Sequence, residues 1–434
     1  MMVERSLFAV EETSNGAIVS HDGSIIEEST KGRLDDLREI GRSTAKPSDR
    51  LDILQAGVTC TRCGSGFSER FSATFDGDLL CWDCAKKANK TEQNEVRHNT
   101  DPTKVVLGES GLYHKSLCDY VINVATGCSH GCKFCYVPST PNITARQKML
   151  AKNVGVDDGQ QEWGSYLLYR DDLPERLGRM LDRKEKWKRT DRGRGVVMLS
   201  SGTDCYQDRR TAQITRGCVI ELVGHGFPVR ILTRSPAVVR DLDVFEWAVE
   251  KSQTRNGELV RIGSSIPCID EDQVRAIEPG APAPKARLRA LNTLSDAGIP
   301  VYVSMSPTYP TQTREDIDNL LREFAELGAE VVFHEPINPR GGNFQMIIDA
   351  AREAGESTLA DELQRISNDR EYWVKYSLQQ MAWAEELGEK HDVDVHIWPD
   401  KQVIKSVGGK KAEKLRKQRD TVSPERIATP SLPS

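Results

Sequence analysis

The chain has 434 residues, of which 38% are hydrophobic and 29% charged, and its formal net charge is −6. This composition is typical of a globular protein with one large α/β domain and a small one, or with two to three ordinary domains. No apolar run approaches the roughly 20 residues that a membrane helix needs, and acidic residues stand where a secretory signal has its apolar core. We therefore expect a cytoplasmic protein without a membrane partner, and the negative charge does not by itself indicate nucleic-acid binding.

The first 92 residues hold a cysteine-rich segment. Residues 1–50 are polar and weakly periodic, so we expect a poorly defined N-terminal segment there. Residues 51–92 contain CTRC at 60–63 and CWDC at 81–84. Two Cys-x2-Cys pairs at this separation predict a zinc ribbon in which one Zn²⁺ is held by Cys60, Cys63, Cys81 and Cys84. Four thiolates leave no open coordination position, which indicates a structural clip, or a finger that docks nucleic acid or protein.

Strands and helices alternate over residues 110–345. Short β-branched runs are separated by amphipathic segments, several of which end in Gly, at 120–125, 196–201, 229–233, 259–265, 301–306 and 330–334. Six strand–helix units predict a parallel sheet with right-handed crossovers. We expect an α/β fold, a partial (β/α)6 TIM-type barrel whose chemistry lies at the carboxyl ends of the strands.

The carboxy-terminal part has a different pattern. Residues 346–408 predict a helical extension with one strand-like run, VDVHIWP. Residues 409–434 begin with KKAEKLRKQR and end in a stretch rich in Ser, Thr and Pro. We expect this basic and polar tail to be disordered, although its basic opening is compatible with a helix.

A second cysteine group follows the first predicted strand of the barrel. The sequence NVATGCSHGCKFCYVPS places Cys128, Cys132 and Cys135 in the pattern C-x3-C-x2-C. Three thiolates on a tight loop are suited to three irons of a 4Fe–4S cubane, and the fourth iron stays open to the amino and carboxylate groups of S-adenosylmethionine (SAM). The alternative is a zinc site with three sulfur ligands.

This motif resembles that of the radical SAM superfamily, and Tyr136 after the third cysteine is a further match. The resemblance extends over about 118–342. The segments SSGTDCYQ, ILTRSPAVVRDLDVF and SSIPCIDEDQVRAIEPGAPAPKARLRALNTLSDAGIPVYVSMSPTYP are similar to those of spore photoproduct lyase-like proteins, also called DNA repair photolyases. The resemblance implies reductive cleavage of SAM at a 4Fe–4S cluster, giving a 5′-deoxyadenosyl radical. It also implies a low-potential electron donor such as flavodoxin or ferredoxin.

The resemblance also implies roles for polar residues at the strand ends. The second strand's end, with Ser201, Gly202, Thr203 and Asp204, is expected to meet the amino group of SAM, and its alternative role is to cap the next helix. Arg234 is expected to pair with the SAM carboxylate, and Ser264 and Ser265 with the ribose. A substrate or SAM pocket is expected at the sixth strand's end, around His334, Asn338 and Arg340. Structural hydrogen bonding or a solvated loop is the competing account.

Three further residues are candidates for radical chemistry. Spore photoproduct lyase uses a hydrogen-donating cysteine a few tens of residues beyond the cluster, and no cysteine lies between Cys135 and Cys205 here. Cys205 follows the second strand, so we expect it to face the barrel mouth as a hydrogen-atom donor, with Tyr136 or Tyr206 as a partner. Otherwise it is a small residue beside SAM.

These features predict a radical SAM enzyme of lyase or transferase type that acts on nucleic acid in repair or modification. The basic stretches near 62–90, 183–194 and 410–419 favour this substrate, although each is also explained as a solvated helix face. One alternative is a radical SAM enzyme that modifies a peptide or small molecule. The other is a non-enzymatic Fe–S and zinc protein that senses redox state.

Overall fold

The computed structural model describes residues 96–183, 195–199, 201–253, 257–339 and 341–422, together with short strands before residue 81. Those strands pair as β1 (Glu11–Glu12) with β2 (Ile18–Val19), β3 (Val58–Thr59) with β4 (Gly66–Phe67), and β5 (Ala73–Phe75) with β6 (Asp78–Leu80). Some predictions lie outside the described residues. They concern residues 184–194, the tail beyond residue 422, and the side chains of Arg340, Cys60, Cys63, Cys81 and Cys84.

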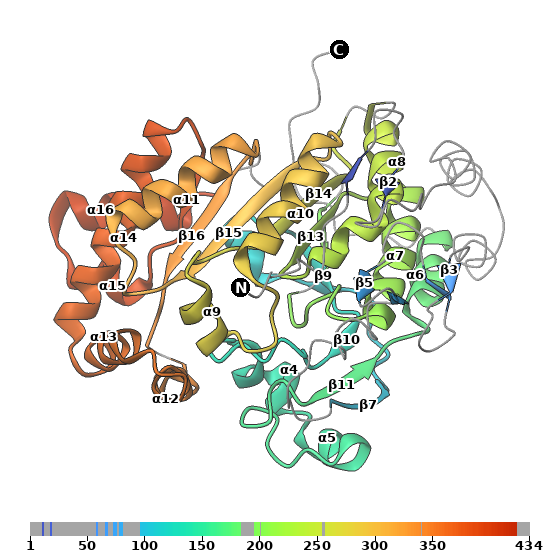
Figure 1. Cartoon of the computed structure of the whole chain (residues 1–434), viewed down its shortest axis with the longest axis horizontal. Coiled ribbons are helices and arrows are strands. Elements are labelled where there is room, and N and C mark those ends of the chain that lie inside the picture. The colour runs from blue at the N-terminus through green and yellow to red at the C-terminus, as the bar shows by residue number, and fades with distance from the viewer. Residues whose placement is uncertain are drawn as a thin grey trace.

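An eight-stranded sheet forms the centre of the described structure (Figure 1). Its spatial order is β17-β16-β15-β14-β13-β12-β9-β8, and every neighbouring pair is parallel except β8–β9. In chain order the strands are β8 (Gly108–Glu109), β9 (Tyr120–Ile122), β12 (Val197–Leu199), β13 (Val229–Thr233), β14 (Val260–Ser265), β15 (Val301–Thr308), β16 (Val332–Pro336) and β17 (Val395–Ile397). The predicted α/β fold with a parallel sheet is confirmed.

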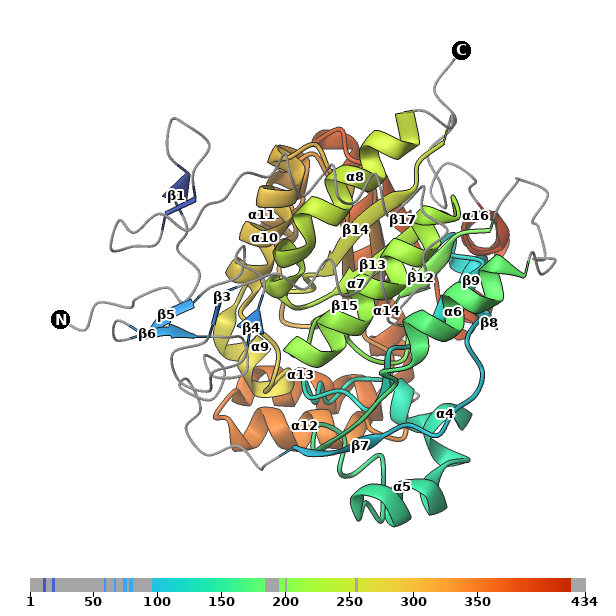
Figure 2. The same cartoon turned by 90° about the vertical axis from the view of Figure 1, so that its right-hand side faces the viewer.

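Helices cover the outer face of this sheet (Figures 1 and 2). They are α6 (Leu173–Asp182), α7 (Arg209–Gly224), η3 (Pro236–Asp241), α8 (Leu242–Gln253), α10 (Pro284–Asp296) and α11 (Arg314–Glu326). Helix α9 (Glu271–Ile277) packs instead against the C-terminal helices. Capping boxes begin two of the covering helices, at Asp208 for α7 and at Thr313 for α11. Gly298 and Gly328 follow α10 and α11 at φ 75° and 72°, where glycine turns the chain back into the sheet.

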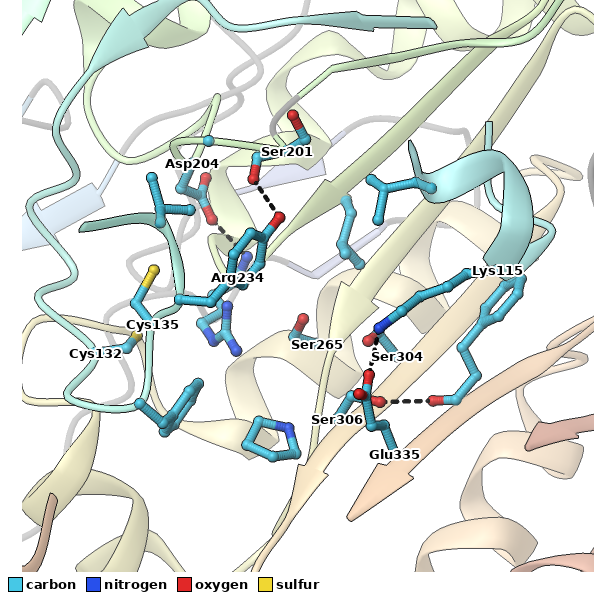
Figure 3. A pocket seen from close by; sticks show the side chains of 18 of the residues that line it. Lys115, Cys132, Cys135, Ser201, Asp204, Arg234, Ser265, Ser304, Ser306 and Glu335 are labelled. Atoms are coloured by element: carbon cyan, nitrogen blue, oxygen red, sulfur yellow. Dashed lines mark hydrogen bonds and ion pairs between the residues drawn. The ribbon is translucent and has the colours of Figure 1, made fainter. Parts of the chain in front are cut away.

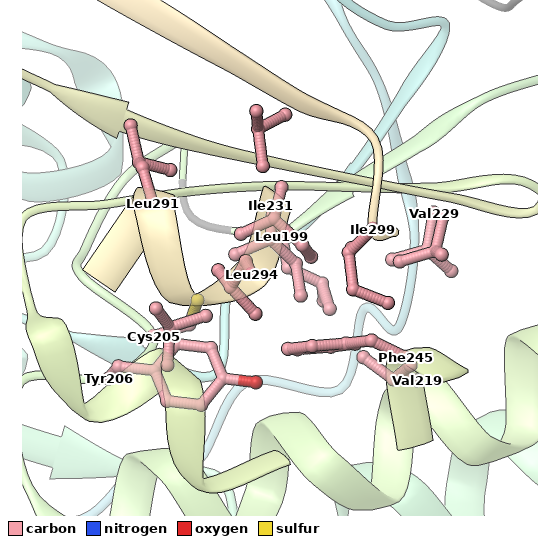
Figure 4. Close-up of a cluster of buried hydrophobic side chains, with 14 of the residues drawn as sticks. Leu199, Cys205, Tyr206, Val219, Val229, Ile231, Phe245, Leu291, Leu294 and Ile299 are labelled. Carbon is pink, nitrogen blue, oxygen red and sulfur yellow. The ribbon is translucent and has the colours of Figure 1, made fainter. Parts of the chain in front are cut away.

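The main hydrophobic core lies between the sheet and these helices (Figure 4). Leu199 and Ile231 face it from the strands, and Phe245 and Leu294 from the helices. All four side chains are buried, and burial of such side chains contributes roughly 1.5–3 kcal/mol each. The short β-branched runs that predicted the strands therefore supply the side chains with which the sheet packs against these helices.

A small three-stranded sheet lies beside the main one. It consists of β10 (Ala125–Thr126), β11 (Tyr166–Tyr169) and β7 (Arg97–Thr100), with β11 antiparallel to β10 and parallel to β7. The short helices η2 (Val137–Ser139), α4 (Pro141–Thr144) and α5 (Gln147–Val154) connect β10 to β11. Strand β10 ends two residues before Cys128, so this small sheet fixes the start of the cysteine loop.

The predicted C-terminal helical extension is confirmed, and it completes the main sheet. Its helices are α12 (Phe344–Glu353), α13 (Ser357–Asn368), α14 (Arg370–Lys390) and α15 (Lys401–Ser406). The expectation of a disordered tail from residue 409 is wrong at its start, where the basic opening continues the extension as helix α16 (Gly409–Asp420). Strand β17 joins the sheet at β16, and α16 contacts η1 (Gly111–Lys115), which precedes β9 near the opposite edge. Within the described residues, no helix is both long and apolar enough to cross a membrane.

Candidate active site

A cavity of ≈ 630 Å³ lies at the carboxyl ends of the parallel strands. Polar residues from the ends of β12, β13, β14 and β16 line it together with the cysteine loop. Figure 3 shows Cys132 and Cys135 at one end of the cavity and the ion pair of Lys115 with Glu335 at the other. This is the strand end at which (β/α) barrels place their chemistry.

Neighbouring segments hold the cysteine loop in place through hydrogen bonds to the backbone of the loop. The amide of Lys133 donates to the carbonyl of Ile277 at 2.9 Å, and the amide of Gly280 donates to the carbonyl of His130 at 2.9 Å. The Asn343 side-chain amide donates to the carbonyls of Lys133, at 2.6 Å, and Cys135, at 3.0 Å. These contacts position the loop without occupying a thiol group.

The three cysteines fit the donor set of a 4Fe–4S cluster. All three line the same cavity, where Cys128 and Cys132 are buried and Cys135 is half-buried. Burial raises the pKa of each thiol to about 12, so thiolates here need a positive centre such as iron. Among the described residues, no three His, Cys, Asp or Glu side chains surround a single metal ion. A cubane does not need that arrangement, because each cysteine binds its own iron.

Asp204 lies at the end of β12 and organises its surroundings. Its carboxylate accepts hydrogen bonds from the amides of Tyr206, at 2.9 Å, and Arg234, at 2.7 Å, and from the hydroxyl of Thr233, at 2.6 Å. His130 Nδ1 lies 3.4 Å from the same carboxylate. With these partners Asp204 joins the ends of β12 and β13 to the cysteine loop, and the N-cap of the following helix is Asp208 instead.

Arg234 ends β13 and points into the cavity, as expected for an anion-binding group. Its Nε lies 3.0 Å from Glu278, which also accepts from Arg287 at 2.7 Å and from the Tyr309 hydroxyl at 2.9 Å. Burial alone would raise the pKa of Glu278, but the guanidinium groups of Arg287 and Arg234 hold it below its usual range. Glu278, which the sequence presents only as a loop residue before Pro279, thus orients Arg234.

The remaining residues at the strand ends divide into two groups. Ser201, Gly202, Thr203 and Ser265 line the cavity. Ser264 does not, and its hydroxyl donates to the carbonyl of Thr233 at 2.7 Å. At the end of β16, His334 and Asn338 line the cavity, and the Asn338 amide donates to Asp400 at 2.7 Å.

The expected position of Cys205 at the barrel mouth is wrong. Its side chain is 0% exposed and lies in the hydrophobic core between the sheet and the helices (Figure 4). Tyr206 is buried in the same cluster, and its hydroxyl donates to Asp241 at 3.0 Å. The chain turns after Asp204, which directs both side chains away from the cavity. Tyr136, in contrast, lines the cavity, is 59% exposed, and donates from its hydroxyl to the carbonyl of Ser201 at 3.0 Å.

Several lining residues escaped the sequence analysis. Lys115 comes from η1, Asn343 from the start of α12, and Trp398 from the segment after β17. None belongs to a motif, and each reaches the cavity only through the pairing of distant segments. The one available signal was the aromatic residue in the strand-like run VDVHIWP.

Comparison with known proteins identifies the superfamily of this chain. The chain matches the Radical SAM superfamily over residues 122–324. An uncharacterized protein of Acidianus two-tailed virus is 31% identical over 292 residues, which span 65% of this chain and 89% of that protein. An uncharacterized protein of Mycobacterium tuberculosis is 29% identical over 226 residues, which span 51% of this chain and 59% of that protein. The chain belongs to the radical SAM superfamily.

Solved structures of spore photoproduct lyase are similar to this chain at low sequence identity. One variant with bound AdoMet and dinucleoside spore photoproduct has a TM-score of 0.44 and 14% identity, covering 68% of this chain and 86% of that chain. Another variant has a TM-score of 0.45 and 13% identity, covering 69% and 80%.

Proposed function

We propose that this radical SAM enzyme acts on a nucleic acid, in repair or modification. The observation that carries the radical SAM part is the convergence of Cys128, Cys132 and Cys135 on the cavity formed by the strand ends. When bound, the cluster and SAM supply the reductive cleavage that yields methionine and a 5′-deoxyadenosyl radical. The chain's own residues hold the loop, orient Arg234 as the partner of the SAM carboxylate, and enclose the reaction.

The polar strand ends are assigned to SAM in this proposal. Ser201, Gly202 and Thr203 lie beside the cysteines in the cavity lining, and Gly202 leaves the backbone accessible. Asp204 acts by fixing the amide of Arg234, because its lone pairs already have protein partners. Ser265 is the serine of β14 assigned to the ribose, since Ser264 faces away from the cavity.

Tyr136 is the proposed hydrogen-atom donor or relay. It is the member of the expected group Cys205, Tyr136 and Tyr206 that lines the cavity. Its position immediately after Cys135 places the phenol beside the metal-binding loop, and its hydrogen bond to Ser201 holds it at the mouth.

The nucleic-acid part of the proposal rests on local features of the chain. Helix α16 carries six basic and two acidic residues, a local excess of positive charge on a chain of net charge −6. The proposed zinc ribbon is supported by its flanking strands, since β3 and β4 lie on either side of Cys60 and Cys63, and β6 ends at Leu80, next to Cys81. A ribbon of this kind is suited to docking a nucleic acid.

Anaerobic reconstitution tests the enzyme. Full-length protein loaded with iron and sulfide is expected to form 5′-deoxyadenosine from SAM under dithionite, and Cys132→Ala is expected to lose it. Cys218→Ala, which removes a buried thiol outside the cavity, is the matched control and should keep the product. The nucleic-acid assignment requires salt-sensitive binding of an oligonucleotide, and wild-type protein that binds none at low salt would exclude it.

A further inference from the structure

The end of the cavity opposite the cysteines is built by η1, β16 and the segment of the C-terminal extension that follows β17. We call it the distal end and define it by Lys115, His334, Glu335 and Trp398, all of which line the cavity. Figure 3 shows the Lys115–Glu335 pair across the cavity from Cys132 and Cys135. The Nζ and Oε2 atoms of this pair are 2.5 Å apart, and both side chains are about 30% exposed. The distal end therefore has its own charged and aromatic groups, separate from those beside the cysteines.

Trp398 gives the distal end a flat aromatic surface flanked by two cations. Lys115 Nζ lies 5.4 Å from its ring centroid, and Arg419 Cζ of α16 lies 4.2 Å from it. The Trp398 amide donates to the carbonyl of His334 at 3.1 Å, and Arg419 Nη1 donates to the carbonyl of Pro399 at 2.5 Å. These hydrogen bonds fix the backbone at Trp398 and Pro399, and the Trp398 side chain is half-buried at the cavity wall.

His334 adds a buried ring nitrogen to the distal end. Its side chain is 1% exposed and lines the cavity, and its Nδ1 makes no hydrogen bond within the part of the chain that the structure describes. Its Nε2 lies 3.4 Å from the hydroxyl of Thr308. A buried ring nitrogen without a partner is costly, so a ligand that supplies a hydrogen bond here is favoured.

Helix α16 extends the positive charge away from Trp398. Lys410, Lys411, Arg416 and Lys417 are exposed, and within the described residues they form no ion pair. Lys414 differs, because it pairs with Glu385 at 2.7 Å. The helix carries Arg419 against Trp398 at its last turn, so its basic surface is continuous with the distal end.

We infer that the distal end is a nucleobase-binding subsite, in which one base stacks on Trp398 and bonds to His334 while α16 binds the adjoining phosphates. This rests on the proposed nucleic-acid function and adds the residues that select the substrate. Aromatic stacking with flanking Lys and Arg is the usual chemistry by which proteins hold single-stranded nucleic acid. An extruded or single-stranded nucleotide is the form that fits, since a base within a duplex has no free face.

Fluorescence anisotropy with reconstituted full-length protein tests the subsite. The probes are a labelled single-stranded oligonucleotide and the same oligonucleotide with abasic positions. We expect Trp398→Ala to weaken binding of the intact oligonucleotide by roughly 5- to 100-fold, and Trp398→Phe by less. On the abasic probe, which wild type also binds more weakly, Trp398→Ala should cause no further loss.

The pair of probes separates stacking from misfolding. The inference is contradicted if Trp398→Ala weakens binding of the intact probe and of the abasic probe by the same factor relative to wild type. In that case the substitution has disrupted the binding surface in general and has not removed a stacking contact. A variant whose affinity is unchanged also contradicts the inference. Neither result contradicts the proposed function. The proposed function fails if wild-type protein binds no nucleic acid at low salt, or if it prefers an acidic peptide of matched charge.

Base selectivity tests the role of His334. Wild-type protein should discriminate among homopolymers of the four bases, and His334→Ala should reduce that discrimination while Trp398→Phe retains it. Equal affinities for all four homopolymers in wild-type protein would remove His334 from the subsite.

Discussion

The loop that carries Cys128, Cys132 and Cys135 is packed backbone to backbone against the segment around Gly280. A Cβ atom at Gly280 would lie 2.3 Å from the carbonyl oxygen of Ser129 and 2.9 Å from that of His130. Both contacts are to backbone, so neither can be relieved by a side-chain rotation. Glycine is required here because the loop approaches closely, and the loop's position depends on it.

Gly280→Ala is therefore expected to displace the cysteine loop. Overpacking of this kind costs about 1–3 kcal/mol, and we expect lower iron and sulfide content after reconstitution, with a matching fall in 5′-deoxyadenosine. Gly224→Ala is the matched control, because among the described residues no atom outside its own helix and chain neighbours lies within 4 Å of the added Cβ at that position. Full iron content in Gly280→Ala would show that the loop tolerates the shift.

A second prediction at the residue scale concerns the protonation of His334. Burial lowers its pKa from 6.5 to about 3, so the native side chain stays neutral while the unfolded chain takes up a proton below pH 6.5. Because the unfolded state binds more protons in this range, the free energy of unfolding falls as the pH decreases from 6.5 toward 3.

His334→Asn is expected to remove this contribution. The difference in unfolding free energy between wild type and variant should change with a slope approaching about 1.4 kcal/mol per pH unit below pH 6.5, and should be flat above it. Urea unfolding at a series of pH values measures that difference. Parallel curves for His334→Asn and wild type would mean that His334 is protonated in the native protein.

At the scale of elements, Asp101 ties the segment after the N-terminal cysteines to the barrel. Its carboxylate accepts from the Thr126 hydroxyl at 2.5 Å, from Arg146 Nη2 at 2.6 Å and from the Thr103 amide at 2.8 Å. Burial alone would raise the pKa of Asp101, but these hydrogen bonds and the charge of Arg146 lower it below 3.8. One carboxylate thus links β7, β10 and α5.

Asp101→Asn is expected to lower the free energy of unfolding by about 2 kcal/mol at pH 7, because hydrogen bonds to a charged group are lost. The depressed native pKa means that this contribution is complete above pH 3.8 and disappears as the pH falls through the native value. Chemical unfolding of wild type and variant at pH 7, and at a series of pH values below 3.8, measures it. Asp172→Asn, which removes an exposed carboxylate 3.4 Å from Arg176, should change stability by less than about 0.5 kcal/mol.

The strands of the barrel could be predicted from the sequence because each is a short, buried, β-branched run, and such runs carry their own signal. Strand β7 could not be predicted, since RHNT is polar and lies in a segment that looks like a linker. It is a strand because it pairs with β11, 66 or more residues away in the sequence. Strand β17 was predicted as the strand-like run VDVHIWP, but its place in the sheet was not, because that place depends on a partner before the whole helical extension.

The candidate site was predictable where motif and strand end coincide. Cys128, Cys132, Cys135 and Arg234 follow strands directly, and all four line the cavity. Cys205 also follows a strand, but the direction of its side chain depends on a local turn that spacing does not reveal. The aromatic residue in VDVHIWP was the one signal for Trp398, and it did not indicate the site, because Trp398 reaches the cavity only through β17.

For the whole molecule, the C-terminal extension closes the space between the two edges of the open sheet. Strand β17 is at one edge and β8 at the other, and the Lys115–Glu335 pair and the contact of α16 with η1 bridge them. The extension is therefore part of the cavity wall as well as a carrier of positive charge.

The proposed contacts of α16 with phosphates are tested by the salt dependence of oligonucleotide binding. For a single strand the logarithm of affinity falls with the logarithm of salt concentration with a slope of about −0.7 per phosphate contact. Replacing Lys410, Lys411 and Lys417 by Gln should therefore make this slope less steep by up to about 2. The stacking contribution of Trp398 should stay the same, because it does not involve counterion release.

A triple variant with the same change in net charge is the control for that measurement. Lys148, Lys152 and Lys375 are exposed on α5 and α14, away from the residues that line the cavity. Their replacement by Gln should leave the salt slope of wild type in place, since a diffuse change in charge alters long-range attraction but releases no bound counterions. If both triple variants make the salt slope less steep by the same amount, nucleic acid is attracted by the overall charge of the protein. Helix α16 would then be a solvated helix that does not contact the substrate.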